Sequence, residues 1–197
     1  MNLFETIMRF DMWVNTLLYN ARNTTALKIF SWITFLGEST TIIALTLITF
    51  ILLWLAHKKW QSIVLWVVVA GSAGSTFIAK LIFDRPRPLN AAILETSNSF
   101  PSGHATIAVA FYGFLAYLLF KNTKSLLLRL LIISVTFVLI VAIGFSRLYL
   151  GVHYTSDVLV GYLVGLTWLL IGVFIHNPSN LPPIAPFLKK VYNIPIN

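Results

Sequence analysis

Long runs of residues without a single charge dominate this chain and restrict it to a few folds. Five runs have about the length needed to cross a bilayer, roughly 17–25 residues. Because lipid offers no water to satisfy backbone N–H and C=O groups, each run is expected to be a helix. The sequence therefore predicts an all-α fold, a polytopic transmembrane helical bundle with five spans at residues 39–56, 62–79, 105–120, 130–146 and 158–175.

The composition agrees with a membrane protein. Hydrophobic residues make up 58% of the chain and charged residues 10%, whereas a soluble domain carries about 25% charged residues. The net charge of +8 would suggest a nucleic-acid partner in a soluble protein. Here most Lys and Arg flank the apolar runs, so we expect contact with the lipid bilayer and no nucleic-acid partner. The lack of cysteine excludes disulfides and thiolate chemistry.

The first 37 residues have a less regular pattern. Residues 3–19 are apolar but include Glu5, Arg9 and Asp11, which argues against a cleavable signal peptide. Two interpretations stay open: the N-terminal segments are interfacial helices, or the first is an imperfect sixth span. We expect three regions, namely N-terminal helices at 1–37, a transmembrane catalytic domain at 38–176 and a cytoplasmic proline-rich tail at 177–197.

The positions of Lys and Arg predict the orientation of the bundle in a cell membrane. An excess of these residues marks the cytoplasmic face. Seven of them share one side of the predicted bundle: Lys58, Lys59, Lys121, Lys124, Arg129, Lys189 and Lys190. The opposite, extracytoplasmic side carries four, which run against the rule and need a reason of their own: Lys80, Arg85, Arg87 and Arg147.

The first polar cluster on that side follows the second span. Lys80 lies near the end of the span, where a cation costs roughly 2.5–3.5 kcal/mol unless it reaches water or finds a partner. One interpretation is a snorkelling Lys80 with a salt bridge between Asp84 and Arg85. The other is a Lys80–Arg87 pair that binds an anion, with Arg87 held by the prolines beside it.

The second cluster is Pro101-Ser102-Gly103-His104, at the start of the third span. A helix N-terminus offers unpaired N–H groups and a positive dipole end, which suits phosphate. Ser102 is expected to cap the helix or to donate to a ligand oxygen, and Gly103 permits close approach of the backbone. An ordinary helix start explains Ser102 but leaves His104 without a role.

The third cluster joins the fourth and fifth spans and contains Arg147, His153 and Asp157. His153 and Asp157 are four residues apart, a spacing that places them on one helix face. A carboxylate in that position holds one tautomer of the imidazole and stabilises its cation. The alternative is that Asp157 only complements the helix dipole, and that interpretation leaves His153 and Arg147 unexplained.

Together the clusters resemble the signature of the type 2 phosphatidic acid phosphatase (PAP2) family. The match covers Lys80 to Asp157 and agrees in residue type, order and spacing. The resemblance implies hydrolysis of a phosphate ester through a phosphohistidine, without a metal or another cofactor. It implies His153 as nucleophile, Asp157 as its orienting carboxylate and His104 as general acid and base. The implied phosphate ligands are Lys80, Arg87, Ser102, Gly103 and Arg147.

The predicted substrate is a membrane lipid phosphate, because the clusters lie at span ends where a lipid head group is found. The resemblance to small bacterial members favours phosphatidylglycerophosphate, with undecaprenyl diphosphate next. Two alternatives are a phosphotransferase with the same site and, less favoured, an anion transporter. No protein partner is predicted. We expect loop water to solvate Glu38 and Glu95, and Arg85 to pair with Asp84 at most.

Overall fold

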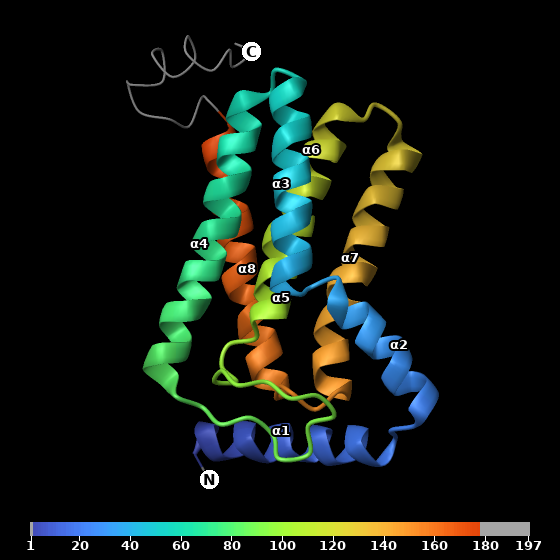
Figure 1. Cartoon of the computed structure of the whole chain (residues 1–197), viewed down its shortest axis with the longest axis vertical. Coiled ribbons are helices and arrows are strands. Elements are labelled where there is room, and N and C mark those ends of the chain that lie inside the picture. The colour runs from blue at the N-terminus through green and yellow to red at the C-terminus, as the bar shows by residue number, and fades with distance from the viewer. Residues whose placement is uncertain (1, 178–197) are drawn as a thin grey trace.

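The computed structural model describes residues 2–177, and within them every regular element is helical. The helices run almost end to end along the chain (Figure 1). Their bounds are α1 Leu3–Asn20, α2 Thr24–Phe35, α3 Ser39–Leu55, α4 Lys59–Phe83, α5 Gly103–Ile107, the π-helical turn η1 Ala108–Tyr112, α6 Gly113–Asn122, α7 Leu126–Tyr149 and α8 Thr155–His176.

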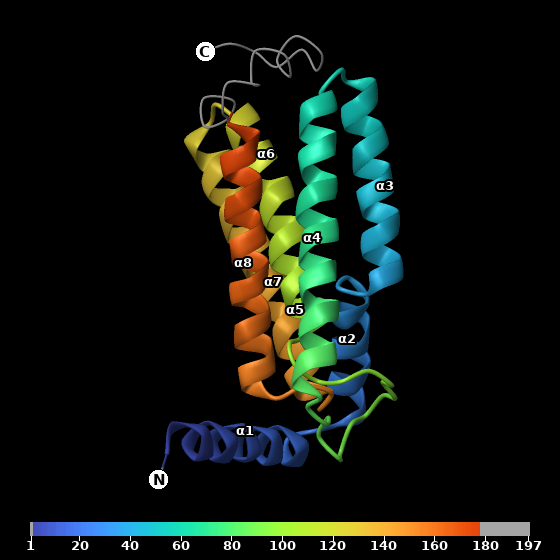
Figure 2. The same cartoon turned by 90° about the vertical axis from the view of Figure 1, so that its left-hand side faces the viewer.

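The predicted transmembrane bundle is confirmed. Four helices are long and apolar enough to cross a membrane: α4, the continuous α5–η1–α6 rod, α7 and α8. The remaining predicted span, residues 39–56, corresponds to α3, which reaches that length only together with α2, across a bend of 40°. These helices stand side by side and connect the two ends of the bundle (Figures 1 and 2). Of the predicted tail at 177–197, all residues after Asn177 lie outside the described part of the chain.

The first helix departs from this arrangement, because α1 lies across the ends of the spans instead of beside them (Figure 2). Apart from the buried Asp11, its side chains are at least partly exposed, and several of the exposed ones are large and apolar. An amphipathic helix perpendicular to the spans is the arrangement of an interfacial helix. Of the two interpretations of residues 3–19, the structure thus favours the interfacial one.

Two glycines bring α8 against α5. A Cβ atom on Gly161 would lie 2.7 Å from the carbonyl oxygen of Ser102, and one on Gly165 would collide with the carbonyl of Thr106. Only glycine permits this backbone-to-backbone contact, as at many helix interfaces in membranes. The N–H of Ser102 donates to the carbonyl of Asp157 at 3.0 Å. The second and third polar clusters are therefore joined directly.

Candidate active site

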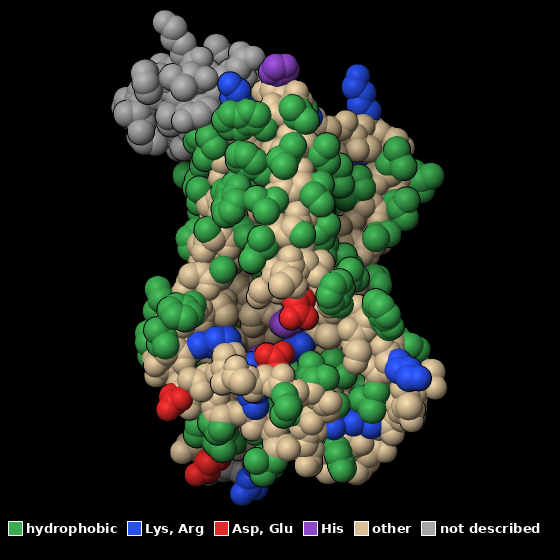
Figure 3. Space-filling model, viewed as in Figure 1, with side chains coloured by type: hydrophobic (Ala, Val, Ile, Leu, Met, Phe, Trp, Pro, Cys, Tyr) green, Lys and Arg blue, Asp and Glu red, His purple; other side chains and the backbone are tan. Residues whose placement is uncertain are grey.

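The three predicted clusters meet at one end of the bundle, around a cavity of about 440 Å³. Figure 3 shows a hollow there, in which basic, acidic and histidine side chains gather below the apolar surface of the spans. The two histidines of the signature face this one space, although they come from different parts of the fold. The signature residues that line the cavity are Lys80, Arg87, Gly103, His104, Arg147 and His153.

His153 lies buried in the short connection between α7 and α8. Nη1 of Arg87 lies 3.2 Å from its Nε2. A guanidinium can only donate, so Nε2 presents its lone pair and the ring proton is on Nδ1. Nδ1 lies 3.5 Å from Oδ2 of Asp157, which is long for a hydrogen bond but close enough for an ion pair with a protonated ring. This tautomer places the lone pair on Nε2, the ring nitrogen that faces the cavity cation Arg87.

The surroundings of His153 keep its ring neutral at pH 7. Burial lowers the pKa of His153 to about 4; Asp157 opposes this shift, and Arg147 and Arg87 add to it. A neutral imidazole is the form that attacks phosphorus. Asp157 is itself buried and accepts the N–H of Tyr154 at 2.9 Å, which fixes the carboxylate in the first turn of α8.

Backbone oxygens hold Arg87 in place. Its Nε donates to the carbonyl of Ser97 at 2.7 Å, and its Nη1 donates to the carbonyl of Val152 at 2.8 Å. Pro86 and Pro88 stand on either side and restrict the chain. Because Val152 precedes His153, this arginine connects the segment after α4 to the α7–α8 connection.

Arg147, on the last turn of α7, is only 1% exposed. Its Nη1 donates to the hydroxyl of Thr34 in α2 at 2.8 Å, and its Nη2 donates to Glu95. The other oxygen of Glu95 lies 3.4 Å from Nη2 of Arg87. Burial alone would raise the pKa of Glu95, but Arg147 and then Arg87 outweigh it and the pKa is lowered. The prediction that loop water solvates Glu95 is therefore wrong, because its carboxylate bridges two arginines in the cavity.

Lys80 points from the end of α4 toward the irregular segment that follows. Its ammonium donates to the carbonyl of Asn98 and lies 3.4 Å from the hydroxyl of Ser97. The Asn98 side chain donates in return to the carbonyl of Lys80 at 2.9 Å. The cation thus lines the cavity with partners, and it is not simply extended toward water.

His104 stands one residue into α5, and its Nε2 is buried without a hydrogen-bond partner among the described residues. A buried polar atom of this kind normally has a partner, so its orientation toward the cavity suggests that a ligand completes it. Gly103 lines the cavity beside it. Ser102 is fully buried, caps α5 through the N–H of Ala105, and is not among the lining residues.

Comparison with known proteins agrees with this geometry. The family model of the PAP2 superfamily matches residues 60–180. The chain belongs to the PAP2 superfamily. It is 33% identical to phosphatidylglycerophosphatase B of Bacillus subtilis (strain 168) over 141 residues, which is 71% of this chain and 70% of that protein. It is 29% identical to undecaprenyl-diphosphatase BcrC of the same organism over 165 residues, 79% of each chain.

A solved structure has the same fold. The crystal structure of a transmembrane PAP2-type phosphatidylglycerolphosphate phosphatase from Bacillus subtilis superposes with a TM-score of 0.80 at 28% identity, covering 85% of each chain. The resemblance proposed from the sequence is therefore confirmed. Six of the eight site residues predicted from that resemblance line the cavity.

One arginine of the PAP2 site was misassigned from the sequence. Arg85 does not pair with Asp84, which is exposed and has no ion pair among residues 2–177. Instead Arg85 binds Asp157 at 2.6 Å and Asp11 of α1 at 2.8 Å. The signal available in the sequence was Asp11, an acidic residue in the middle of the mostly apolar segment 3–19.

Three carboxylates near the cavity, those of Asp11, Glu95 and Asp157, are each paired with arginines. Within the described part of the chain there is no group of three His, Asp or Glu side chains arranged to hold a metal ion. Arg85 serves Asp11 and Asp157, while Arg87 and Arg147 share Glu95. What this arrangement offers to an anion is a set of fixed cations and two imidazoles.

Proposed function

We propose that this PAP2 member hydrolyses the head-group phosphate of a membrane lipid at the extracytoplasmic face, through a phosphohistidine on His153. The observation that carries the proposal is the shared cavity: both imidazoles and the cations Lys80, Arg87 and Arg147 line it. A tetrahedral phosphate fits this set of groups, because cations stabilise its oxygens while one imidazole attacks and the other protonates.

In the first step, Nε2 of His153 forms a bond to phosphorus and the bond from phosphorus to the leaving oxygen breaks. The ring becomes cationic as the N–P bond forms, and Asp157 beside Nδ1 stabilises that charge. His104, protonated at this point, gives its proton to the leaving oxygen. The leaving group is a lipid alcohol for a monophosphate and a lipid monophosphate for a diphosphate.

In the second step, His104 takes a proton from water, and the resulting hydroxide attacks phosphorus. The P–N bond breaks, inorganic phosphate leaves and the neutral ring of His153 returns. His104 then holds a proton again and is ready for the next cycle. One histidine thus alternates between acid and base, which balances the protons over the complete reaction.

The three cations act mainly on the transition state. Negative charge spreads over the nonbridging oxygens as the phosphoryl group moves, and fixed donors stabilise it without reorganising. Arg87 and Arg147 already hold a carboxylate, that of Glu95, so the phosphate takes over an existing anion position. The first N–H groups of α5 at Gly103 add a positive dipole end to the cavity.

The substrate is expected to be a lipid because one wall of the cavity is apolar and faces the membrane. Ile43 of α3 and Phe77 of α4 line the cavity and are also 55% and 64% exposed. The cavity therefore opens between α3 and α4, on the surface that contacts lipid tails. A head group can reach the cations there while its tail stays in the bilayer.

The extracytoplasmic orientation rests on the distribution of charge. Because α1 and α2 lie at the site end (Figure 1), they add Arg9, Arg22 and Lys28 to that side. The four cations of the site region are explained by their carboxylate partners and the phosphate. When these four are left out of the count, the site end carries three Lys and Arg residues. The far end of the described chain carries five: Lys58, Lys59, Lys121, Lys124 and Arg129. The excess still favours a cytoplasmic far end.

The chain has no cysteine, which provides a clean background for testing the orientation. Leu94 is fully exposed in the segment beside the site, and Lys124 lies in the connection at the far end. In intact cells, a membrane-impermeant maleimide should label Leu94→Cys and leave Lys124→Cys unlabelled until the cells are opened. The reverse labelling pattern would place the site in the cytoplasm.

The substrate itself is tested by phosphate release from purified protein in detergent with added lipid. The panel contains phosphatidylglycerophosphate, undecaprenyl diphosphate and phosphatidate, and we expect the first to be hydrolysed fastest. The names of the relatives favour the first two lipids. Free phosphate must account for the lipid consumed, since a phosphorylated acceptor would instead indicate a phosphotransferase. A chain that releases no phosphate from any of the three would contradict the proposal.

A further inference from the structure

Asp11 is an unusual residue for the place it occupies. It is 1% exposed and is the one buried residue of α1, a helix whose large apolar side chains are otherwise exposed. Burying a carboxylate is unfavourable by several kcal/mol unless it is paired and hydrogen-bonded. Asp11 meets that requirement, since it accepts from Nη2 of Arg85 at 2.8 Å and from the N–H of Ser156 at 2.9 Å.

Arg85 connects this carboxylate to the nucleophile. The guanidinium spans the two acids, with Nη2 on Asp11 and Nη1 on Oδ1 of Asp157 at 2.6 Å. Asp157 turns its other oxygen toward His153. The ring of Tyr154 covers the guanidinium at 4.4 Å. Oδ1 of Asp157 is thus held by Arg85, while Oδ2 faces His153 and accepts the N–H of Tyr154, so Arg85 and this N–H together fix how the carboxylate is turned.

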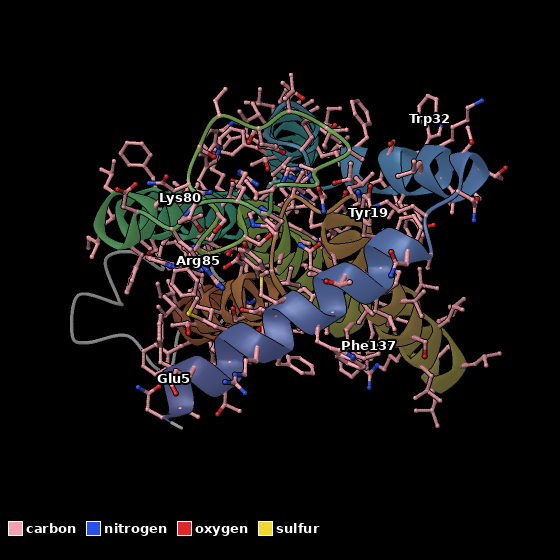
Figure 4. All side chains as sticks on the ribbon, turned by 90° about the horizontal axis from the view of Figure 1, so that it is seen from below. Glu5, Tyr19, Trp32, Lys80, Arg85 and Phe137 are labelled. Atoms are coloured by element: carbon pink, nitrogen blue, oxygen red, sulfur yellow. The ribbon has the colours of Figure 1, made fainter. Side chains whose placement is uncertain are left out.

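Polar contacts of Asp11 help to hold α1 on the bundle. Figure 4 shows α1 crossing the end of the bundle with Arg85 beside it. A second cavity of about 560 Å³ separates part of α1 from the ends of the spans, and its lining includes Phe4, Met8, Phe83 and Phe100. Apolar packing is therefore incomplete beneath α1, and the Asp11–Arg85–Ser156 contacts are what join it to the start of α8.

We propose that α1 positions the catalytic pair through the chain Asp11–Arg85–Asp157–His153, so that Asp11 and Arg85 are positioning residues of the reaction. This proposal rests on the proposed function of His153. Neither residue lines the site cavity, so neither contacts the phosphate. Both act on Asp157, by fixing its rotation and by setting the charge that His153 experiences.

The charges of Asp11 and Arg85 have opposite signs, so removing each should shift the protonation of His153 in opposite directions. Asp11, Arg85 and Asp157 together carry one net negative charge near His153. Asp11→Asn removes a negative charge and makes the His153 ring harder to protonate. Arg85→Gln removes a positive charge and makes it easier to protonate. A role limited to folding does not produce shifts of opposite sign, and the double variant restores the original net charge.

Other charged groups around His153 remain constant in this comparison. Arg147 and Arg87 lower its tendency to protonate, and Asp157 raises it. Glu95 and His104 also interact with it electrostatically, and Lys80 lines the same cavity. These groups come from α4, the segment before α5, α5, α7 and α8, and none is altered by the two substitutions.

The test uses the full chain in detergent with ¹³C-labelled histidine. The chain has only four histidines, and His153→Ala identifies the signal of interest. We expect the His153 titration midpoint to rise by about one unit in Arg85→Gln, to fall in Asp11→Asn, and to return near the wild-type value in the double variant. We also expect kcat to fall at least tenfold in each single variant with KM within twofold, and Arg85→Lys to recover part of kcat.

Controls separate positioning from folding. Removing one partner of a buried ion pair is strongly destabilising, whereas removing both is often tolerated, so the double variant stays measurable if a single one fails to fold. Glu5→Gln removes an exposed acid of the same helix, keeps its capping box, and should change nothing. If the double variant is folded and its kcat equals that of the wild type, the proposal is overturned.

The same experiment distinguishes failure of the proposal from failure of the proposed function. If the wild-type chain hydrolyses no lipid phosphate, the proposed function is wrong, while the NMR titration still reports on the Asp11–Arg85–Asp157 coupling. If the wild type is active and the His153 midpoint is the same in folded Arg85→Gln, Asp11→Asn and wild type, the coupling is absent and the positioning role is wrong.

Discussion

The carboxylate of Glu95 lies between the guanidinium groups of Arg147 and Arg87 and accepts a hydrogen bond from each. This position is where the proposed mechanism requires phosphate oxygens. In the proposed mechanism, Glu95 is therefore an internal anion that the substrate displaces. The segment that carries it, between α4 and α5, has no regular secondary structure over residues 84–102, so its movement disturbs no helix.

Replacing Glu95 by Gln should make the unliganded protein less stable and phosphate binding tighter. Arg147 is almost completely buried, and losing its ionised partner leaves a charge without compensation, at about 3–5 kcal/mol. Added phosphate or vanadate supplies that partner. Thermal unfolding of Glu95→Gln should therefore shift upward with phosphate more than the wild type does. Equal shifts in both proteins would show that Glu95 does not compete for the anion position.

The two histidines should give different defects. His153→Ala should retain a few per cent of activity at most, because no other group forms the bond to phosphorus. His104→Gln should lose about 10²–10⁴-fold with a lipid substrate, the usual contribution of a general acid or base. With p-nitrophenyl phosphate, whose leaving group needs no proton, His104→Gln should accumulate a phosphoprotein. Quenched-flow labelling with ³²P detects it, and its absence from the double variant with His153→Ala is the control.

Stability should depend on pH through His153. The unfolded ring has a pKa near 6.5, while burial lowers the folded value to about 4. Between these values the unfolded state binds more protons than the folded state. The contribution of the neutral His153 ring to the free energy of unfolding is therefore fully present above pH 6.5 and is lost as pH falls toward 4. The loss amounts to about 3 kcal/mol. It is measured by thermal unfolding from pH 7 to pH 4, and His153→Gln should make this part of the curve less steep.

Phosphate release should continue in excess EDTA. The cavity contains three fixed cations, and the described residues offer no acidic group suited to a metal. Rates with EDTA and with added Mg²⁺ should agree within about twofold. Loss of activity in EDTA that Mg²⁺ restores would overturn the metal-independent mechanism.

Two glycines on different helices offer a matched comparison of packing. In Gly161→Ala the new Cβ would lie 2.7 Å from the carbonyl oxygen of Ser102, so α5 and α8 must separate. Overpacking of this kind costs about 1–3 kcal/mol. A Cβ at Gly74 meets nothing within 4 Å, so Gly74→Ala should be neutral or slightly stabilising. Unfolding in detergent compares the two, and equal stabilities would contradict the close contact.

Much of the fold was predictable because the length of an uncharged run can be read directly from consecutive residues. All five predicted runs coincide with helices, although α4, the α5–η1–α6 rod, α7 and α8 each extend beyond their runs at both ends. The N-terminal helix was left open between two interpretations, since its apolar pattern with three charges fits either. Only its contact with the end of the bundle distinguishes them.

The site residues could be proposed from the sequence because a spacing such as that of His153 and Asp157 can be seen in one stretch of it. The partners of Arg85 and Glu95 could not be found in this way. Asp11 and Arg85 are 74 residues apart, and Arg147 and Glu95 are 52 apart. Their pairing depends on how the irregular segment after α4 folds back, which no local pattern specifies.

The opening of the cavity between α3 and α4 has a consequence for enzymology. A substrate that arrives sideways from the bilayer is encountered in two dimensions, so the turnover rate should follow its mole fraction in the lipid or micelle and not its molarity in the buffer. Diluting the surface with inert detergent, at constant total substrate, should slow the reaction. Affinities measured for this protein are therefore meaningful only together with the composition of the surface around it.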